Sequence, residues 1–177
     1  DMGWSQFGNE VEDCVTTGDC EPFDDEEMVT LRDVKPLGIF QDEIVVDFGD
    51  FCLLGYIDDR TEEKDGIVEI VRDYKTKSKS SKADLHDPKK LQLELYILGL
   101  QQRGFEVKRA EYLIIERLGG RACMNGGGRE SLTVGNNIWK EKYLFSQKSI
   151  ERAESIVRET VKEISDYYKI FKALNVK

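Results

Sequence analysis

Three short runs rich in β-branched and aromatic residues most constrain the fold, because turn-forming dipeptides separate them. Residues 43–48 and 51–57 flank a Gly-Asp dipeptide that suits a tight hairpin turn. A third run, residues 67–74, follows a wholly polar stretch that ends in Asp65-Gly66, so we interpret that stretch as a second connection. The sequence therefore predicts a three-stranded antiparallel meander.

Two acidic side chains and a lysine belong to these runs. Successive strand residues point to opposite faces, so Asp73 and Lys75 share one face of the third strand. Asp58 follows the second run directly. If both strands were straight and flush, an antiparallel pair would hold Asp58 and Asp73 at opposite ends. A bend, a bulge or a stagger therefore has to bring the two carboxylates together.

The residue types suit divalent-metal chemistry on a phosphate. Hard cations such as Mg²⁺ prefer carboxylate, carbonyl and water oxygens, and one or two protein carboxylates commonly suffice together with substrate phosphate. Asp58 and Asp73 supply two carboxylates. An ammonium at Lys75 is suited to orient an attacking water or to stabilise developing negative charge. This combination predicts a metal-dependent nuclease.

The order of the motifs resembles a known nuclease family. A Gly-Tyr-Ile-Asp sequence ending at Asp58, then Asp73-Tyr-Lys75, then Gln92 and Tyr96 are similar to the G-x-x-D strand, D-Y-K strand and Q-x-x-x-Y helix of the RecB-like branch of the PD-(D/E)XK nuclease superfamily. The similarity covers residues 50–117, and more loosely the whole chain. The resemblance implies that Asp58 and Asp73 bind Mg²⁺ or Mn²⁺, that the Tyr74 backbone carbonyl also coordinates it, and that Lys75 is catalytic.

The same resemblance implies three further site residues. Gln92 and Tyr96 either contact substrate or shape the site. Many family members carry a histidine four residues after a glycine of an early helix, as an additional metal ligand. Glu12 stands at that place here, and a carboxylate is a sensible replacement for a hard metal. Glu10 and Asp13 remain alternatives for this role.

Cysteine and histidine placement gives little support for another metal centre. Some relatives in this branch hold an Fe–S cluster with one upstream cysteine and three near the C-terminus. Three cysteines precede the predicted catalytic strands here and one follows them, namely Cys14, Cys20, Cys52 and Cys123. We therefore predict no Fe–S cluster, and without a C-x-x-C spacing the case for zinc is weak. The sole histidine, His86, is interpreted as a surface loop residue.

Composition sets the outer limits. A chain of 177 residues that is 40% hydrophobic is the size of one well-packed domain, so residues 1–177 are expected to form a single domain. The start at Asp1-Met2 leaves open whether native residues precede it. No apolar run of about 18 residues is present, so no membrane span is predicted. Scattered cysteines fit an intracellular, reducing setting better than a disulfide framework.

The net charge of −9 opposes a nucleic-acid partner, because basic surface normally supplies affinity for phosphates. Much of the excess acid is local, at residues 21–27 and 62–65. Lysines crowd the segment that leaves the third strand: Lys75, Lys77, Lys79, Lys82, Lys89 and Lys90. This basic segment is interpreted either as a solvated loop or as a guide for a DNA strand. Oligomeric state is left undetermined.

The second half of the chain supplies the remaining elements. A helix is predicted from Asp87-Pro88 to Gly104, with two leucine- and isoleucine-rich stripes that bury it against the sheet. Residues 110–117 form another strand, which makes this helix a crossover. Residues 119–129 are interpreted as a mobile glycine-rich loop, with substrate contact by Arg121 or Arg129 a minority alternative. Residues 146–174 form a long helix whose apolar stripe faces the core.

The predicted fold is α/β, with a restriction-endonuclease-like central mixed sheet of about four or five strands flanked by helices. The predicted function is metal-dependent hydrolysis of DNA, and the resemblance favours an exonuclease acting on single-stranded ends or flaps. Two alternatives remain. One is a nuclease-fold module that binds DNA or protein without cutting, and the other is a small acidic partner protein in which the motif residues form only a structural ion pair.

Overall fold

The computed structural model describes residues 2–78 and 88–175, and the side chains of residues 3–78 and 91–169 within them. The helices are α1 (Met2–Thr17), α2 (Asp25–Leu31), α3 (Pro88–Gln102), α4 (Gly120–Ala122) and α5 (Gln147–Asn175), with short turns η1 (Cys123–Gly127) and η2 (Arg129–Ser131). The strands are β1 (Ile39–Asp47), β2 (Cys52–Arg60), β3 (Glu63–Lys64), β4 (Ile67–Lys77), β5 (Glu106–Leu118) and β6 (Thr133–Tyr143).

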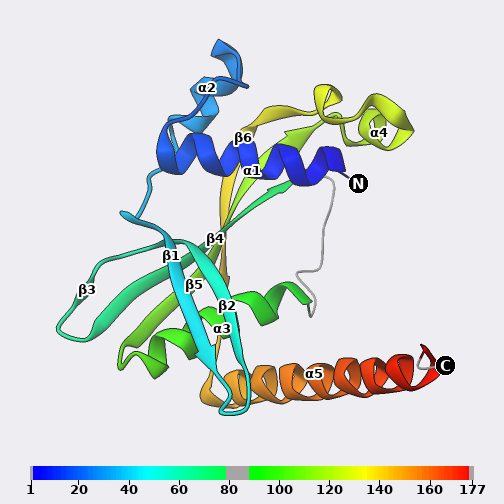
Figure 1. The fold of residues 1–177 in the computed structure, drawn as a ribbon. Helices are drawn as coiled ribbons and strands as arrows, with labels where there is room; N and C mark the ends of the chain where they lie inside the picture. Colours follow the sequence, from blue (N-terminus) through cyan, green and yellow to red (C-terminus); the bar gives the residue numbers. More distant parts are fainter. Residues whose placement is uncertain (1, 79–87, 176–177) are drawn as a thin grey trace.

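The described strands form one mixed sheet of six strands in the order β1-β2-β4-β5-β6, with β3 paired to β4 (Figure 1). The β4–β5 pair is parallel, whereas β1–β2, β2–β4 and β5–β6 are antiparallel. Helices flank this sheet on both faces. The predicted α/β class and restriction-endonuclease-like mixed sheet are therefore confirmed.

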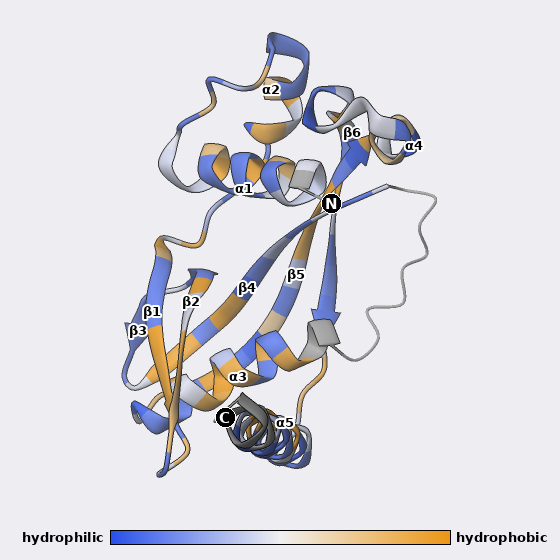
Figure 2. Cartoon of the chain, turned by 45° about the vertical axis from the view of Figure 1, so that its right-hand side comes forward, coloured by the Kyte–Doolittle hydropathy of each residue, from blue (hydrophilic) through white to orange (hydrophobic). Residues whose placement is uncertain are grey.

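Two apolar clusters lie on opposite faces of the sheet. One joins α3 and α5 to the strands through residues such as Ile97, Ile114 and Ile150, and the other joins α1 and α2 through Phe7 and Leu113. Hydrophobic residues colour much of α3 and the adjoining stretches of β1 and β2 (Figure 2). Because residues 113 and 114 are consecutive in β5, their division between the clusters follows from strand alternation.

The strands that carry the predicted acids form one continuous hairpin. Its tip is Asp65-Gly66, with φ of 53° and 78°, and both central residues of a type I′ turn need such positive values. The backbone N–H of Thr61 donates to the carbonyl of Ile70 at 3.1 Å, which links the two paired segments. The partners are Lys64↔Ile67, Glu63↔Val68, Arg60↔Val71 and Asp59↔Arg72, in one unbroken register.

This register overturns the expectation that a bend, bulge or stagger must bring the acids together. The pairing ends at Asp59↔Arg72, and Asp58 and Asp73 are the next residues of the two strands, so both acids lie at the same end of it. The error arose because the polar stretch before Gly66 was interpreted as a loop, whereas it belongs to the hairpin as the end of β2 and as β3. Residues 58–65 are all polar, so they lack the apolar–polar alternation that normally indicates a strand.

The crossover between β4 and β5 is confirmed. β5 is parallel to β4 and α3 lies between them in sequence, packed on the sheet through Leu93 and Ile97. Gly104 ends α3 with a φ of 91°, and the backbone N–H of Phe105 donates to the carbonyl of Leu100 at 3.0 Å. This left-handed glycine is the common way to end a helix. The predicted start at Asp87 lies outside the described residues.

The segment after β5 differs from the prediction. Residues 119–129 form the compact turns α4 and η1 rather than a mobile loop without helix. Arg129 is structural: it pairs with Glu10, donates to the Leu132 carbonyl at 2.9 Å and stacks on Phe7. The sequence analysis also missed β6, whose Gly-Asn-Asn stretch has low strand propensity and which, among the described strands, pairs only with β5.

The long C-terminal helix is confirmed, but its stripe is only partly buried. Ile150, Ala153 and Val157 are buried on α3 and the sheet. Beyond them the helix extends past the rest of the molecule (Figure 1), and Ile164 is 63% exposed and Tyr168 61% exposed. The prediction of a core-facing stripe along the whole helix is therefore wrong.

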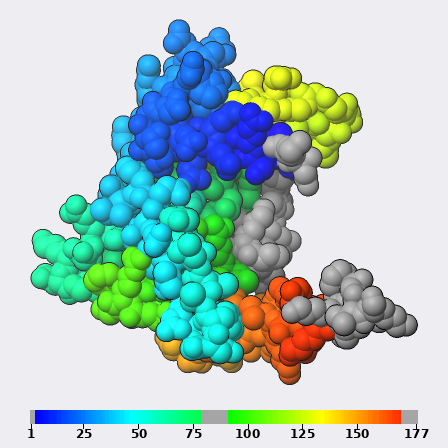
Figure 3. Space-filling view, viewed as in Figure 1, coloured from blue at the N-terminus to red at the C-terminus, as the bar shows by residue number. Residues whose placement is uncertain are grey.

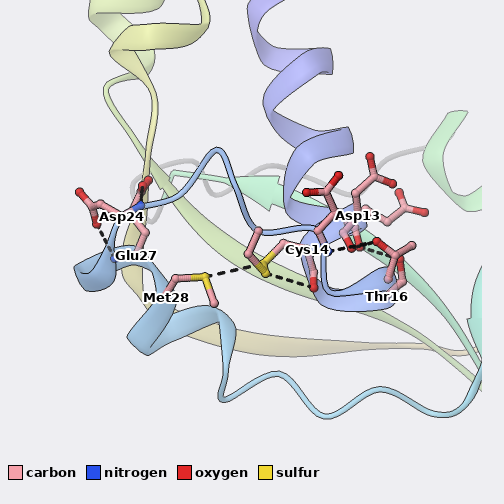
Figure 4. Close-up of a disulfide and its surroundings, with 10 residues drawn as sticks. Asp13, Cys14, Thr16, Asp24, Glu27 and Met28 are labelled. Atoms are coloured by element: carbon pink, nitrogen blue, oxygen red, sulfur yellow. Dashed lines mark hydrogen bonds between the residues drawn. A yellow bond between two sulfur atoms is a disulfide. The ribbon is translucent and has the colours of Figure 1, made fainter.

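A disulfide joins Cys14 at the end of α1 to Cys20 (Figure 4). Cys14 Sγ lies 3.8 Å from Met28 Sδ of α2, so the bridge sits between the two helices. Glu27 of α2 reaches the sheet, where its carboxylate accepts from the backbone N–H of Val134 at 2.8 Å. The expectation of unpaired cysteines is wrong for this pair, whereas Cys52 and Cys123 are free thiols.

The hairpin tip gives a direct test of the register. We expect Gly66→Ala to lower the free energy of unfolding by about 1–2 kcal/mol, because a Cβ is disfavoured at positive φ. No atom lies within 4 Å of the added Cβ, so the loss reports backbone strain alone. Gly120→Ala is the matched control, since its site is equally open and its φ is not positive. Denaturant unfolding showing equal effects would contradict the turn assignment.

Candidate active site

Asp58 and Asp73 meet in the interior at the end of the β2–β4 pairing. Asp73 is fully buried and Asp58 is 8% exposed. Asp58 Oδ2 accepts from the backbone N–H of Tyr74 at 2.9 Å, so the carboxylate occupies the place of the next ladder bond. The backbone of β4 thus positions the Asp58 side chain beside Asp73.

Lys75 connects these acids to α3. Its Nζ lies 2.6 Å from Asp73 Oδ2 and donates to Gln92 Oε1 at 3.3 Å. Gln92 Nε2 in turn donates to the Tyr96 hydroxyl at 2.6 Å. The structure therefore brings together the two acids, the lysine and the glutamine–tyrosine pair, which are separated by up to 38 positions along the chain.

Glu12 projects from α1 toward the same place. It contacts the side-chain amide of Gln41 and lines two cavities that also contain Asp58. Of the two alternatives to Glu12, Glu10 instead pairs with Arg129, and Asp13 lines only the larger of these cavities. Glu12 is thus the α1 carboxylate best placed to interact with both motif acids.

Burial raises the pKa values of all three acids, and repulsion by neighbouring carboxylates adds to the shift for Asp73 and Glu12. Burial, with the negative charge of Asp58 and against the charge of Lys75, raises the pKa of Asp73 to about 7. Burial, with the charges of Asp58 and Asp73, raises the pKa of Glu12 to about 7. Burial also raises the pKa of Asp58, opposed by its hydrogen bond from Tyr74. Protons or a cation must therefore relieve this concentration of negative charge.

The donor set fits a hard divalent cation. Neither carboxylate oxygen of Asp73 accepts a hydrogen bond of normal geometry from the described residues, although both are buried. Two carboxylates with a backbone carbonyl, here that of Tyr74, form the small oxygen set that Mg²⁺ uses. Within residues 2–78 and 88–175, however, no three Asp, Glu, His or Cys side chains are grouped closely enough to hold a metal together. Ligation by Glu12 stays a prediction.

Two cavities open on either side of these acids. The larger, of about 670 Å³, lies between α1, the β1–β2 hairpin and α3, and the smaller, of about 410 Å³, lies between α1 and β4. Both include Asn9, Glu12, Asp58 and Gln92 in their linings. In the space-filling view α1 lies across the molecule above the β1–β2 hairpin (Figure 3). Glu12 and Asp58 therefore border open cavities, whereas Asp73 lies buried behind Asp58.

A buried arginine network supports the site from the opposite face of β4. Arg72 is 1% exposed, and its Nε and Nη2 donate to Glu111 at 2.9 and 2.7 Å. Its Nη1 lies 3.3 Å from Asp59, which also accepts from the Tyr74 hydroxyl at 2.8 Å. The sequence analysis gave Arg72 no role. The signal was present, because a charge inside an apolar strand needs a buried partner.

The basic segment contributes less to the described site than its composition suggested. Lys75 lies at the site, but Lys77 is 6% exposed and so forms no solvated face. Lys79, Lys82 and His86 lie outside the described residues, as do the side chains of residues 89 and 90. The proposed role of this segment as a guide for DNA stays a prediction.

Comparison with protein families agrees with this geometry. The family model of the PD-(D/E)XK nuclease superfamily matches residues 24–173, which is most of the chain. The chain belongs to the PD-(D/E)XK nuclease superfamily. The matched residues contain Asp58, Asp73, Lys75, Gln92 and Tyr96 and begin after Glu12. No curated protein and no solved structure gives a significant match.

Membership in the PD-(D/E)XK superfamily assigns the chain to a class of metal-dependent nucleases, which hydrolyse phosphodiester bonds of nucleic acid. The residue roles at this site are not part of that finding and remain predictions. None of the described helices is both long enough and apolar enough to span a membrane.

The raised pKa values predict how stability depends on pH. In the metal-free protein Asp73 titrates at about 7 when folded and near 4 when unfolded, so the native state binds more protons between these values. This contribution to stability is complete below pH 4 and is lost as the pH rises through 7. Thermal unfolding in chelator should show Asp73→Asn gaining stability over the unsubstituted protein at pH 8.

The control for this measurement is Asp19→Asn, which removes the same charge from an exposed position. This control separates the effect of burying the Asp73 charge from the effect of lowering the overall negative charge of the chain. If both substitutions change the melting temperature at pH 8 equally, burial of the Asp73 charge is not the cause.

Proposed function

We propose that this chain is a divalent-metal-dependent deoxyribonuclease of the RecB-like branch, and that it acts as an exonuclease on single-stranded ends or flaps. The observation that carries the proposal is the convergence of Asp58 and Asp73 beside Lys75 in a solvent-accessible site. The family match supports the nuclease class. The branch, the DNA substrate and the exonuclease mode come from the motif resemblance.

Asp58, Asp73 and the carbonyl of Tyr74 would hold Mg²⁺ or Mn²⁺ in this proposal. When bound, such a cation neutralises charge on the scissile phosphate and lowers the pKa of water. Asp73 Oδ2 contacts Lys75, but Asp73 Oδ1 is buried without a hydrogen bond from the described residues. This supports the assignment, because a buried carboxylate oxygen without a partner costs free energy. Glu12 would add negative charge across the cavity.

Lys75 is the residue proposed to act on the reacting groups. Its side chain is 25% exposed, so the ammonium is both restrained by Asp73 and accessible from the smaller cavity. A protonated amine there can donate to the attacking water or to a phosphate oxygen as negative charge develops. Gln92 holds the ammonium from the other side, and Tyr96 holds Gln92. We therefore assign Gln92 and Tyr96 a positioning role rather than direct contact with substrate.

The larger cavity supports the preference for unpaired nucleic acid. Its lining includes Ile44, Val46, Leu53, Leu95 and Tyr56 together with the acids Glu12 and Asp58. Apolar and aromatic surface beside a phosphate site suits the face of a base that is not paired. A duplex would keep its bases stacked and away from this surface.

One observation favours the alternative of a binding module that does not cut. The three predicted acidic ligands are not grouped at metal-binding distance among the described residues, and the chain carries a net charge of −9. A chain with an inactive site could keep the fold and the cavities that suit nucleic acid. Activity measurements separate these two functions.

Cleavage of a labelled single-stranded oligonucleotide in Mg²⁺ or Mn²⁺ tests the proposal. We expect Asp73→Asn and Lys75→Met each to lower kcat about 100-fold or more, because each removes charge at the reacting centre. Lys142→Met is the matched control, since Lys142 is an exposed lysine on β6. Circular dichroism checks that each variant is folded.

The outcomes divide the candidate functions. Binding of the oligonucleotide without cleavage by the unsubstituted protein would support the binding module. Neither binding nor cleavage, with Asp73→Asn changing only thermal stability, would leave a structural ion pair. Cleavage that survives both substitutions would disprove the assigned site.

Gln92→Ala tests the positioning role. We expect kcat to fall about tenfold with little change in KM, because Lys75 loses one of the two groups that restrain its ammonium. Tyr96→Phe should have a smaller effect in the same direction, since it removes only the hydroxyl that orients Gln92. A rise in KM with unchanged kcat would instead show that Gln92 binds substrate directly.

A further inference from the structure

Near the site, Arg117 has no acidic partner among the described residues. It lies near the end of β5, and its guanidinium carbon is 4.3 Å from the centre of the Trp4 ring of α1. Both residues line the smaller cavity, together with Lys75 and Asp58. The guanidinium is therefore held flat against α1 beside the proposed catalytic residues.

The described residues offer Arg117 neither an ion pair nor a hydrogen bond. Its Nε is buried without an acceptor. Burial lowers the pKa of Arg117, and the opposing electrostatic contribution comes from the thiol of Cys123 rather than from a carboxylate. By contrast, Arg72 pairs with Glu111 and Arg129 pairs with Glu10. Arg117 thus lacks the partner that a partly buried charge normally has.

A phosphate is the anion that best matches this guanidinium. The planar group presents donors in a fixed fork, which phosphate oxygens can accept in pairs. Stacking on Trp4 keeps the fork in one plane while leaving its edge free to donate. Among the described residues that line the two cavities, Lys75 and Arg117 carry the positive charge, and both belong to the smaller cavity.

The cavity runs along one face of α1 from Arg117 to the acids. Trp4 lies at one end and Glu12 at the other, eight residues apart, which is about 12 Å along a helix. Ser5, Gly8 and Asn9 between them are small or polar and leave room below the helix. A Cβ built on Gly8 would still be 3.9 Å from Thr76 Oγ1. One phosphate cannot reach both ends of this path.

We propose that Arg117, stacked on Trp4, binds a non-scissile backbone phosphate of the same nucleic-acid strand whose scissile phosphate lies at Asp58 and Asp73. The inference rests on the proposed nuclease function and adds a second phosphate subsite to it. The strand would then follow α1, with its backbone in the smaller cavity. The subsite contributes to affinity and register and takes no part in bond cleavage.

Steady-state cleavage of a single-stranded oligonucleotide measures this contribution. We expect Arg117→Met to raise KM about tenfold with kcat within about twofold, as loss of one charged hydrogen-bonding contact predicts. The slope of log kcat/KM against log salt should become shallower by about 0.7, the value for one phosphate contact on a single strand. Arg117→Lys should recover part of the affinity, because it keeps the charge but not the fork.

The matched control is Arg109→Met. Arg109 is an exposed arginine of the same strand, roughly 25 Å from Arg117 along β5, so it removes the same charge far from the cavity. We expect its KM and salt slope to match those of the unsubstituted protein. Equal effects of the two substitutions would show a general charge effect and overturn the subsite.

A second measurement does not depend on how the variants fold. Oligonucleotides with one neutral methylphosphonate at successive positions should reveal one non-scissile position that raises KM for the unsubstituted protein. The same methylphosphonate should add little to the KM of Arg117→Met, because the contact is already lost. If no non-scissile position matters, the inference fails while the nuclease proposal stands. If the unsubstituted protein cleaves nothing, the proposed function fails, and the inference with it.

Discussion

The register of the β2–β4 hairpin is the constraint on which the site depends. A two-residue turn at Asp65-Gly66 sets a register that is kept through β3 and the end of β2 to Asp59↔Arg72. Side chains of an antiparallel pair at the same register position lie on the same face, so Asp58 and Asp73 meet. A slip of one residue would send one carboxylate to the opposite face of the sheet. The turn at Asp65-Gly66 thus determines that Asp58 and Asp73, each seven or eight residues away from it, lie together.

Buried charged side chains are stabilised in different ways on the two faces of β4. Toward α1 and α2, Arg72 pairs with Glu111 and Asp59. Lys140 lies 3.9 Å from Glu111 and balances the second acid, and Tyr74 closes the network through its hydroxyl. The Arg72 network itself needs no ligand. On the opposite face two acids share one lysine, and burial with mutual repulsion raises the pKa of Asp73 to about 7. The excess negative charge on this face suits a cation, which can in turn bind a substrate phosphate. The paired charges on the other face make the strands rigid.

Much of the site could be predicted from local patterns. Strand alternation put Asp73 beside Lys75, and the four-residue spacing in a helix put Gln92 beside Tyr96, as the hydrogen bond between them shows. The glycine with positive φ after α3 was equally clear from sequence. Each of these depends on neighbours within one element, where backbone geometry alone determines which side chains meet.

Other parts depended on partners far apart in the chain. β6 has weak strand propensity and exists because β5 offers it an edge, so its sequence alone did not show it. Full burial along α5 ends at Val157, and after the partly buried Val161 the apolar residues Ile164 and Tyr168 are exposed, although the apolar stripe continues. The sequence by itself determined the acids, the lysine, their order and the α/β class, because these follow from residue type and periodicity. Only the tertiary structure decided that Arg117 stacks on Trp4 without an acid, and that Arg72 has two. Such pairing is set by which distant strands and helices pack together.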